Sequence, residues 1–321
     1  MLSRVADSLY WMARNIERAE HTARLISVQL TSQLEYAAFR DDGDLSAWRA
    51  LLRIGGDDLA FARSQLPSTD QAVLDFLAFA ENNPNSILQC VRIARQNARA
   101  VLGLLPSELW QLINAYYFSM RERQQEALRT ETLHDFIQMV TGFSLQFQGA
   151  VESSIPHNDA YQFMRIGTFL ERAEKMSRVL EVYMRRAASR TDNRDAYEYR
   201  HWSAVLQSVS AHESYILKHG AYIDPDKVAE YLVLDPLFPR SIRYSLEQVR
   251  TAFLAIEHGH VEAYARALHI RVGRACAALE YARMEELWPD PFLQFLADIR
   301  SACGEIGVLL MKTYYLGEIS T

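Results

Sequence analysis

One charged tetrapeptide occurs twice in this chain. Glu-Arg-Ala-Glu stands at residues 17–20 and again at residues 171–174, and a further arginine follows each copy at the same distance, as Arg24 and Arg178. On a helix, glutamate and arginine spaced three or four residues apart lie on one face and form ladders of ion pairs. Carboxylates in such a ladder could act as general acids or bases, and the guanidinium groups could bind carboxylates or phosphates.

These two segments supply most of the candidate site residues. The candidate catalytic carboxylates are Glu17, Glu20, Glu171 and Glu174, and the candidate substrate-binding residues on the same segments are Arg14, Arg18, Arg24, Arg172 and Arg178. One interpretation is a polar cavity on a pseudo-twofold axis, in which these groups bind an amino acid or a peptide. The alternative is structural, with the two ladders pairing with each other and fixing the register of the two halves.

The helix that carries the first copy is predicted to be apolar on two sides. One stripe at helical spacing comprises Val5, Leu9, Met12, Ile16, Ala19, Ala23, Ile26 and Leu30. The opposite side carries Tyr10, Trp11, Leu25 and Val28. The charged strip between them is therefore expected to be buried, although a buried ion pair is by itself weak evidence for stability.

A second cluster of arginines lies between the two copies. Arg92, Arg95 and Arg99 follow one another at helical spacing with Asn97 nearby, and the second half of the chain has a looser version that includes Arg240. Such a stripe could bind phosphate or carboxylate groups, so Arg95, Asn97, Arg99 and Arg240 join the candidate substrate-binding residues. The alternative is a solvated basic face.

No metal or cofactor is expected in this chain. Carboxylate-bridged metal sites in helical bundles use pairs of Glu-x-x-His motifs, and neither copy has one. His21 follows Glu17 by four residues, but Lys175 takes the corresponding place in the second copy. The sequence also lacks a glycine-rich phosphate loop, a GxSxG nucleophile motif and an HExxH motif. A self-contained hydrolase or nucleotide-binding enzyme is therefore not indicated.

The elements that must position these residues are helices. The chain of 321 residues contains only 13 Gly and 9 Pro, and every proline falls between amphipathic runs. No alternating strand pattern competes with the helical one. The fold class is therefore predicted to be all-α with about twelve helices, at 2–39, 46–65, 69–80, 84–104, 107–128, 131–154, 158–189, 194–219, 225–234, 239–258, 261–285 and 291–316.

These helices are predicted to form a tandem duplication. Three anchors recur at an offset of 154 or 155 residues: the Glu-Arg segment, Trp48 with Trp202, and Pro84 with Pro239. We predict two six-helix repeats, at 1–155 and 156–321, packed about a pseudo-twofold axis. Asn83 is expected to cap the helix that begins at Pro84, and the corresponding position before Pro239 is expected to lack a cap.

Charge and cysteine usage indicate the compartment and exclude some partners. The net charge of −6 gives no basic field for nucleic acid. Three cysteines, Cys90, Cys276 and Cys303, lie far apart and form no disulfide framework. No apolar run is long enough to cross a membrane, and charged residues interrupt the N-terminal segment where a signal peptide would be apolar. A cytoplasmic protein without nucleic-acid or membrane partners is expected.

The beginning of the chain resembles the bacterial alpha-E family of helical proteins, named for their Glu-Arg motif. The resemblance rests on the opening MLSRVADSLYWMAR and on IERAE at residues 16–20, and it extends over essentially the whole chain. Further typical segments are ARQNAR at residues 94–99 and FLERAE at residues 169–174. Glu174 stands where family members commonly have Asp, which keeps the carboxylate but changes its reach.

The resemblance implies a partner. Alpha-E proteins are encoded with, and sometimes fused to, circularly permuted ATP-grasp proteins. A role in ATP-dependent formation or processing of amide bonds follows from that context, with ATP and Mg expected on the partner. This chain would then be a helical subunit that helps to bind the amine or acyl-phosphate substrate. The alternatives are an enzyme in its own right, with Glu17 or Glu171 as general base, and a non-catalytic scaffold.

Overall fold

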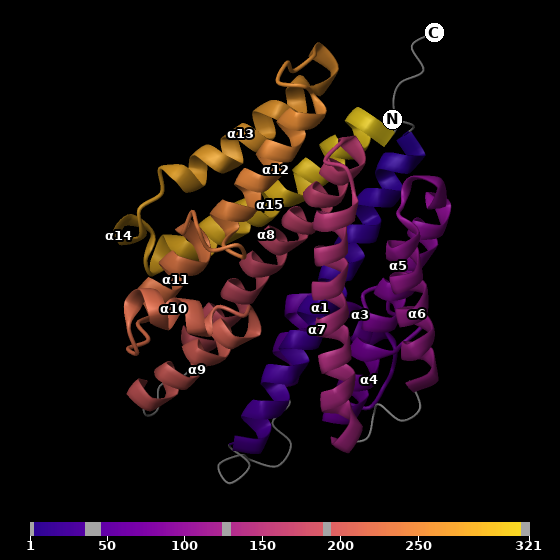
Figure 1. Ribbon diagram of the computed structural model, residues 1–321. Helices are drawn as coiled ribbons and strands as arrows, with labels where there is room; N and C mark the ends of the chain where they lie inside the picture. Colours follow the sequence, from indigo (N-terminus) through magenta and orange to yellow (C-terminus); the bar gives the residue numbers. More distant parts are fainter. Residues whose placement is uncertain (1–2, 36–45, 124–129, 189–193, 316–321) are drawn as a thin grey trace. The chain divides into compact units, whose positions relative to one another are not determined.

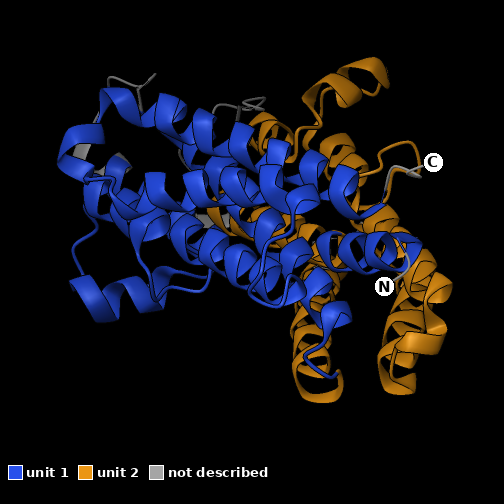
Figure 2. Cartoon of the chain, turned by 90° about the horizontal axis from the view of Figure 1, so that it is seen from above, with its two compact units in different colours: residues 1–14, 156–321 blue, residues 15–155 orange. Residues whose placement is uncertain are grey.

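The computed structural model describes residues 3–35, 46–123, 130–188 and 194–315 (Figure 1). The described residues are 83% helical and include no strand, so the predicted all-α fold class is confirmed. The chain forms two compact units (Figure 2): unit 1 comprises Met1–Arg14 and Pro156–Thr321, and unit 2 comprises Asn15–Ile155. Helix α1 (Ser3–Glu35) contributes its first turns to unit 1 and the rest to unit 2.

Unit 2 is a set of helices that pack mainly on their neighbours in sequence. Its further helices are α2 (Ser46–Gly55), α3 (Asp58–Arg63), α4 (Asp70–Ala78), α5 (Ile87–Ala100), the 3₁₀ turn η2 (Leu102–Leu104), α6 (Ser107–Arg123) and α7 (Thr130–Ser154). Helix α5 packs against α6, which packs against α7, while α4 contacts both α2 and α5. Phe79 and Phe136 meet in the core with ring centroids 4.9 Å apart.

Unit 1 is built around the long helix α8. Its elements after α1 are α8 (Asp159–Ala188), α9 (Arg194–Ser208), α10 (His212–His219), α11 (Pro225–Leu234), α12 (Ile242–Ile256), the 3₁₀ turn η3 (Ala263–Ala265), α13 (Arg266–Glu280), α14 (Met284–Leu287), α15 (Asp290–Leu310) and the π-helical turn η4 (Met311–Tyr315). Helix α8 packs most extensively on α12 and α15, and α13 covers both of these. The second Glu-Arg copy therefore lies on the most enclosed helix of the unit.

The structure divides some of the predicted helical segments into shorter helices. The described residues form fifteen α-helices, thirteen of them seven residues or longer, where about twelve were expected. The segment 46–65 is divided because the chain turns at Gly56, which has a positive φ of 83°. The segment 194–219 is divided at Ser210, which also has a positive φ. These turns contain no proline, so helix boundaries placed at prolines do not predict them.

The expected caps of α5 and α12 were also wrong. Ser86, not Asn83, caps α5, because its Oγ accepts a hydrogen bond from the backbone N–H of Gln89 at 3.3 Å. Asn83 instead donates its amide to the carbonyl of Phe76. Helix α12 does have a cap: Ser241 Oγ accepts from the backbone N–H of Tyr244 at 3.0 Å. The same cap thus stands at an offset of 155 residues, although the duplication itself stays a prediction.

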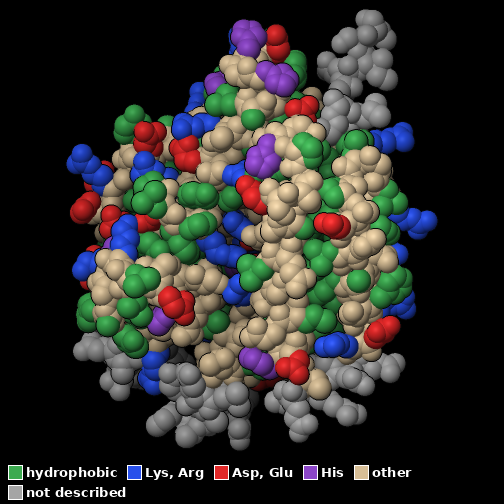
Figure 3. Space-filling view, in the orientation of Figure 1, with side chains coloured by type: hydrophobic (Ala, Val, Ile, Leu, Met, Phe, Trp, Pro, Cys, Tyr) green, Lys and Arg blue, Asp and Glu red, His purple; other side chains and the backbone are tan. Residues whose placement is uncertain are grey.

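The surface on the face shown in Figure 3 mixes both signs of charge. Acidic and basic side chains are interspersed there among the described residues. Among the helices that the structure describes, none combines the length and the apolar character required to cross a membrane.

Candidate functional site

In unit 1, Arg14 joins both glutamates of the second Glu-Arg copy. Its Nε donates to Glu171 Oε2 and its Nη2 donates to Glu174 Oε2, each at 2.7 Å. Its Nη1 donates to the hydroxyl oxygen of Tyr10 at 2.6 Å. All three guanidinium nitrogens are therefore engaged, and the planar fork of arginine suits this arrangement because a lysine has only one nitrogen to share.

This network is buried. Glu171 is completely inaccessible and Arg14 is 7% exposed. Burial alone would lower the pKa of Arg14, but Glu171, Tyr10 and Glu174 together outweigh it and raise that pKa well above its usual value. Removing one partner from such a pair is strongly destabilising, because a buried charge is left without compensation.

The backbones of α1 and α8 come unusually close beside this network. A Cβ atom at Gly167 would lie 2.4 Å from the carbonyl oxygen of Tyr10, nearer than any real side chain can approach. Gly167 precedes Glu171 by about one helical turn. The absence of a side chain at this glycine lets Arg14 reach α8 with two of its nitrogens, Nε and Nη2, while Nη1 bonds Tyr10 on α1 itself.

The first Glu-Arg copy, in unit 2, has different partners. Glu17 Oε2 accepts a hydrogen bond from the amide of Gln148 on α7 at 3.2 Å, and the same amide contacts Ser144 Oγ at 3.3 Å. Glu20 forms an ion pair with Arg24 within the helix. Glu17 and Glu20 are both buried, so the predicted burial of the charged strip is confirmed.

The second residues of the two motifs also differ. Arg18 Nη1 donates to Asn85 Oδ1 at 2.8 Å, and the Asn85 amide donates to Asp57 Oδ1 at 2.8 Å. In the second copy, Arg172 lies over the ring of Phe169, with its guanidinium carbon 5.1 Å from the centroid. A polar chain in one unit thus corresponds to a cation–π contact in the other.

The outer arginine of each ladder remains partly accessible. The side chain of Arg24 is 22% exposed beside the buried Glu20, and the side chain of Arg178 is 28% exposed beside Glu174. Arg178 donates to Glu174 Oε1 at 3.4 Å. The outer arginines are therefore accessible to a further partner, whereas Arg14 and Glu171 are shielded from solvent.

The candidates on α5 do not converge on one ligand. Arg95 donates to Asn114 Oδ1 at 2.7 Å and is surrounded by the rings of Trp110, Tyr117 and Phe118, at 5.0 to 5.6 Å. Asn97 hydrogen-bonds the carbonyl of Ile93 one turn back, and Arg99 is exposed. Arg240 lies in the turn before α12.

Metal and thiol chemistry find no support in the described residues. No group of three or more metal-ligating side chains occurs among them. Burial raises the pKa of Cys276 and of Cys303 to about 12, so neither thiol is a ready nucleophile near neutral pH.

Comparison with protein-family models matches the sequence of this chain to a known family. A family model described as "a predicted alpha-helical domain with a conserved ER motif", named Alpha-E, matches residues 1–315. The chain belongs to the Alpha-E family. The description of this family mentions an ER motif, and this chain has Glu-Arg at residues 17–18 and 171–172.

The Alpha-E relatives among curated proteins are longer than this chain. Uncharacterized proteins of Mycobacterium bovis and Mycobacterium tuberculosis are 25% identical to it over 264 residues, which cover 77% of this chain and 29% of theirs. The chain thus spans less than a third of the length of these relatives. No solved structure is significantly similar to it.

Three residues that contact or position the ladders are not among the site residues that the sequence predicts. Tyr10 and Gln148 hydrogen-bond the ladders, and Gly167 permits the close approach of α1 and α8. The sequence pattern places Tyr10 only on an apolar side of the helix. For Gln148 the sequence carries no signal, because a glutamine far along the chain becomes a partner only through the packing of α7.

Proposed function

We propose that this Alpha-E protein is the helical partner subunit of a circularly permuted ATP-grasp ligase. The partner binds ATP and Mg and activates a carboxyl group, and this chain helps to bind the amine or the acyl-phosphate substrate during amide-bond formation or modification. No nucleic acid or membrane takes part, and the complex is cytoplasmic.

The observation that carries the proposal is the division of each ladder into an inner and an outer part. The inner carboxylates Glu17 and Glu171 are buried and hydrogen-bonded, while the outer Arg24 and Arg178 are partly exposed. A guanidinium group presented in this way suits a carboxylate or an acyl phosphate. Such a surface supplies binding and charge neutralisation, whereas the nucleotide chemistry needs another protein.

The length of the relatives supports the same proposal. Their Alpha-E-like segment accounts for 29% of each chain, so most of each chain lies outside the match. In these relatives, the matched helical segment is therefore joined to further chain, as expected for a module that works together with another domain. In the proposed complex, the second component is the ATP-grasp ligase.

Co-purification with a circularly permuted ATP-grasp protein of the same organism tests the proposal. We expect a stable complex and an ATP turnover that rises when both proteins are present. Replacing both outer arginines by Ala should lower amine-dependent ATP turnover at least about tenfold, because a charge-assisted contact to substrate is lost. Arg185→Ala is the matched control, since Arg185 forms the same type of i,i+4 pair with Glu181 outside the motif.

Three outcomes distinguish the alternatives. Lack of association together with unchanged ATP turnover would overturn the proposal. A stand-alone enzyme predicts that Glu171→Gln abolishes an activity while the melting temperature stays nearly unchanged. A scaffold predicts that the same variant lowers the melting temperature without selective loss of partner activity.

A further inference from the structure

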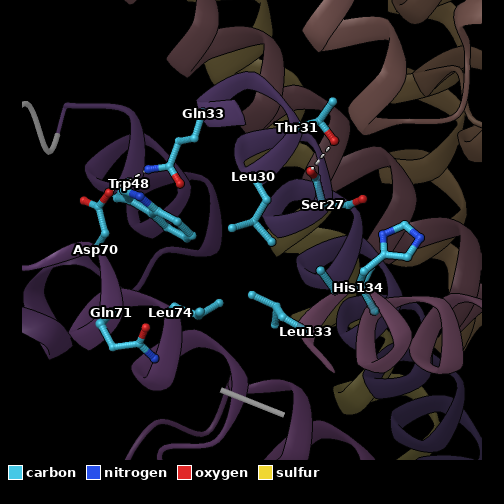
Figure 4. A pocket seen from close by; sticks show the side chains of 11 residues that line it. Ser27, Leu30, Thr31, Gln33, Trp48, Asp70, Gln71, Leu74, Leu133 and His134 are labelled. Atoms are coloured by element: carbon cyan, nitrogen blue, oxygen red, sulfur yellow. Dashed lines mark hydrogen bonds between the residues drawn. The ribbon is translucent and has the colours of Figure 1, made fainter. Parts of the chain in front are cut away.

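Unit 2 contains a pocket that lies apart from the Glu-Arg ladder and is formed by α1, α2, α4 and α7. Its volume is about 260 Å³, and its centre is apolar, with Leu30, Leu74 and Leu133 (Figure 4). For comparison, an engineered apolar cavity of about 150 Å³ holds a benzene molecule. By the same proportion, this pocket has room for a ligand of about ten non-hydrogen atoms.

The Asp70 carboxylate lies at one end of the pocket. Asp70, in the first turn of α4, accepts a hydrogen bond from the Gln33 amide at 2.6 Å, and Figure 4 shows this pair at the opposite end from His134. A carboxylate has two oxygens and can accept further hydrogen bonds beyond that of the amide. A cationic group is therefore favoured at this end, and an anionic ligand group is disfavoured.

The same end holds a buried donor without a partner. Trp48 is 1% exposed, and its indole Nε1 has no hydrogen-bond partner. In Figure 4 the indole lies beside the pair formed by Gln33 and Asp70. A buried donor left unsatisfied costs about 1–3 kcal/mol, so a ligand oxygen that reaches the indole N–H would gain a strong contact.

We propose that this pocket binds the N-terminal aminoacyl group of an apolar amino acid amide or peptide. The ammonium group contacts Asp70, the adjacent carbonyl oxygen accepts from Trp48 Nε1, and the aliphatic side chain fills the space between the three leucines. The carboxylate and the indole donor stand at the same end of the pocket, as an ammonium and its neighbouring carbonyl do in an aminoacyl group. A free amino acid fits less well because its own carboxylate would approach Asp70.

This inference goes beyond the proposed function, since it assigns a ligand and a site to this chain alone. Ligand binding to the pocket is measured on this chain without the ligase. A failure of the pocket proposal therefore leaves the ligase partnership untouched, and the reverse also holds. If both hold, the pocket would retain an amine substrate near the complex.

Leucinamide is the probe, and the indole N–H resonance of Trp48 is the readout. The chain has five tryptophans, and the indole signal that is missing from the spectrum of ¹⁵N-labelled Trp48→Phe identifies Trp48. We expect leucinamide to shift this signal with a dissociation constant on the order of 1 mM, as befits a small ligand. Two analogues each lack one group: 4-methylpentanamide lacks the amine, and 3-methylbutylamine lacks the amide. Each should bind about tenfold more weakly.

Two variants test the assigned contacts separately. Asp70→Asn should weaken leucinamide about tenfold and leave 4-methylpentanamide unchanged. Trp48→Phe, followed by calorimetry, should weaken leucinamide and leave 3-methylbutylamine unchanged. Asp75→Asn is the matched control, because Asp75 lies on the same helix and does not line the pocket.

The proposal is overturned by any of three results. These are no shift of the Trp48 signal at roughly 20 mM leucinamide, equal affinities for leucinamide and 4-methylpentanamide, or an equal loss of affinity in Asp70→Asn and Asp75→Asn. A folded spectrum of each variant excludes unfolding as the cause of a loss.

Discussion

The two Glu-Arg ladders have the same sequence and different surroundings. In unit 1, Glu171 is fully buried against the charged Arg14, while in unit 2 Glu17 is hydrogen-bonded by the neutral Gln148. The arginine that follows the first glutamate also differs: Arg172 lies over the Phe169 ring in unit 1, and Arg18 hydrogen-bonds Asn85 in unit 2. The motif therefore contributes Glu171 to a buried ion pair with Arg14 in unit 1, which we call the ionic brace. In unit 2 the same motif contributes Glu17 to a polar network with Gln148.

The common feature of the two ladders is equally informative. In both units the arginine four residues after the second glutamate is partly exposed. The inner glutamates differ in their partners, whereas the outer guanidinium groups hold the same position in the motif and are similarly accessible. The contrast favours a stabilising role for the buried inner residues, and it leaves the outer guanidinium groups accessible.

The largest effect is expected from removing the brace. Arg14→Ala leaves Glu171 buried without its cation, which should lower the free energy of unfolding by about 3–5 kcal/mol. Glu17→Gln in unit 2 exchanges a charged acceptor for an amide and should cost no more than about 1.5 kcal/mol. Urea titrations followed by circular dichroism measure both. Equal losses of unfolding free energy in Arg14→Ala and Glu17→Gln would show that the two ladders do not differ in their contribution to stability.

A smaller but still large effect is expected at the close approach of α1 and α8. Gly167→Ala places a Cβ against the Tyr10 carbonyl and should cost about 1–3 kcal/mol, because backbone must move. Gly149→Ala in α7 is the matched control: its Cβ would meet no atom within 4 Å, so helix propensity should make it stabilising by about 0.5–1 kcal/mol. Thermal unfolding of the two variants gives the comparison, and stabilisation by Gly167→Ala would contradict it.

Acid should affect unit 1 through a residue that unit 2 lacks. Asp235 corresponds to Ala80 at the 155-residue offset, and its backbone carbonyl, like that of Ala80, accepts from the serine that caps the next helix. Burial raises the pKa of Asp235, but Lys218 and the N–H groups of Leu237 and Phe238 outweigh it and lower that pKa below its usual value. The carboxylate therefore stabilises the fold above its unfolded pKa, and this contribution is lost as the pH falls through the depressed value.

Asp235→Asn should remove this acid dependence. We expect the variant to be less stable than the wild type by about 1–2 kcal/mol at pH 7 and to differ from it little at about pH 2. Melting temperatures across this pH range are the measurement. A constant difference at all pH values would show that the charge of Asp235 is not responsible.

The smallest effects are expected at the two serine caps. Ser86→Ala and Ser241→Ala each remove a hydroxyl that caps the helix and also donates to a backbone carbonyl, and each should cost about 1 kcal/mol. Because the caps have the same geometry, the two losses should agree within about 0.5 kcal/mol. A much larger loss at one serine, in urea titrations, would show that the corresponding positions are not equivalent.

The sequence revealed the helices and the burial of the charged strip, because both follow from periodicity. It did not reveal the turns near Gly56 and Ser210, where no proline marks the break. Nor did it identify the partners: Arg14 was grouped with the ladder, but its contact with Glu171 joins positions 157 residues apart and depends on packing. The pocket lined by Trp48 and Asp70 was missed for the same reason, since its walls come from four separate helices.

A double-mutant cycle between Arg14 and Glu171 tests the ionic brace most directly. The variants Arg14→Met, Glu171→Gln and the pair are compared in urea unfolding at neutral pH. The brace predicts a coupling free energy of about 2–3 kcal/mol, so that the double variant is far more stable than the sum of the single losses implies. Losses that add to within about 0.5 kcal/mol would contradict it and show that the buried glutamate of the motif does not owe its place to Arg14.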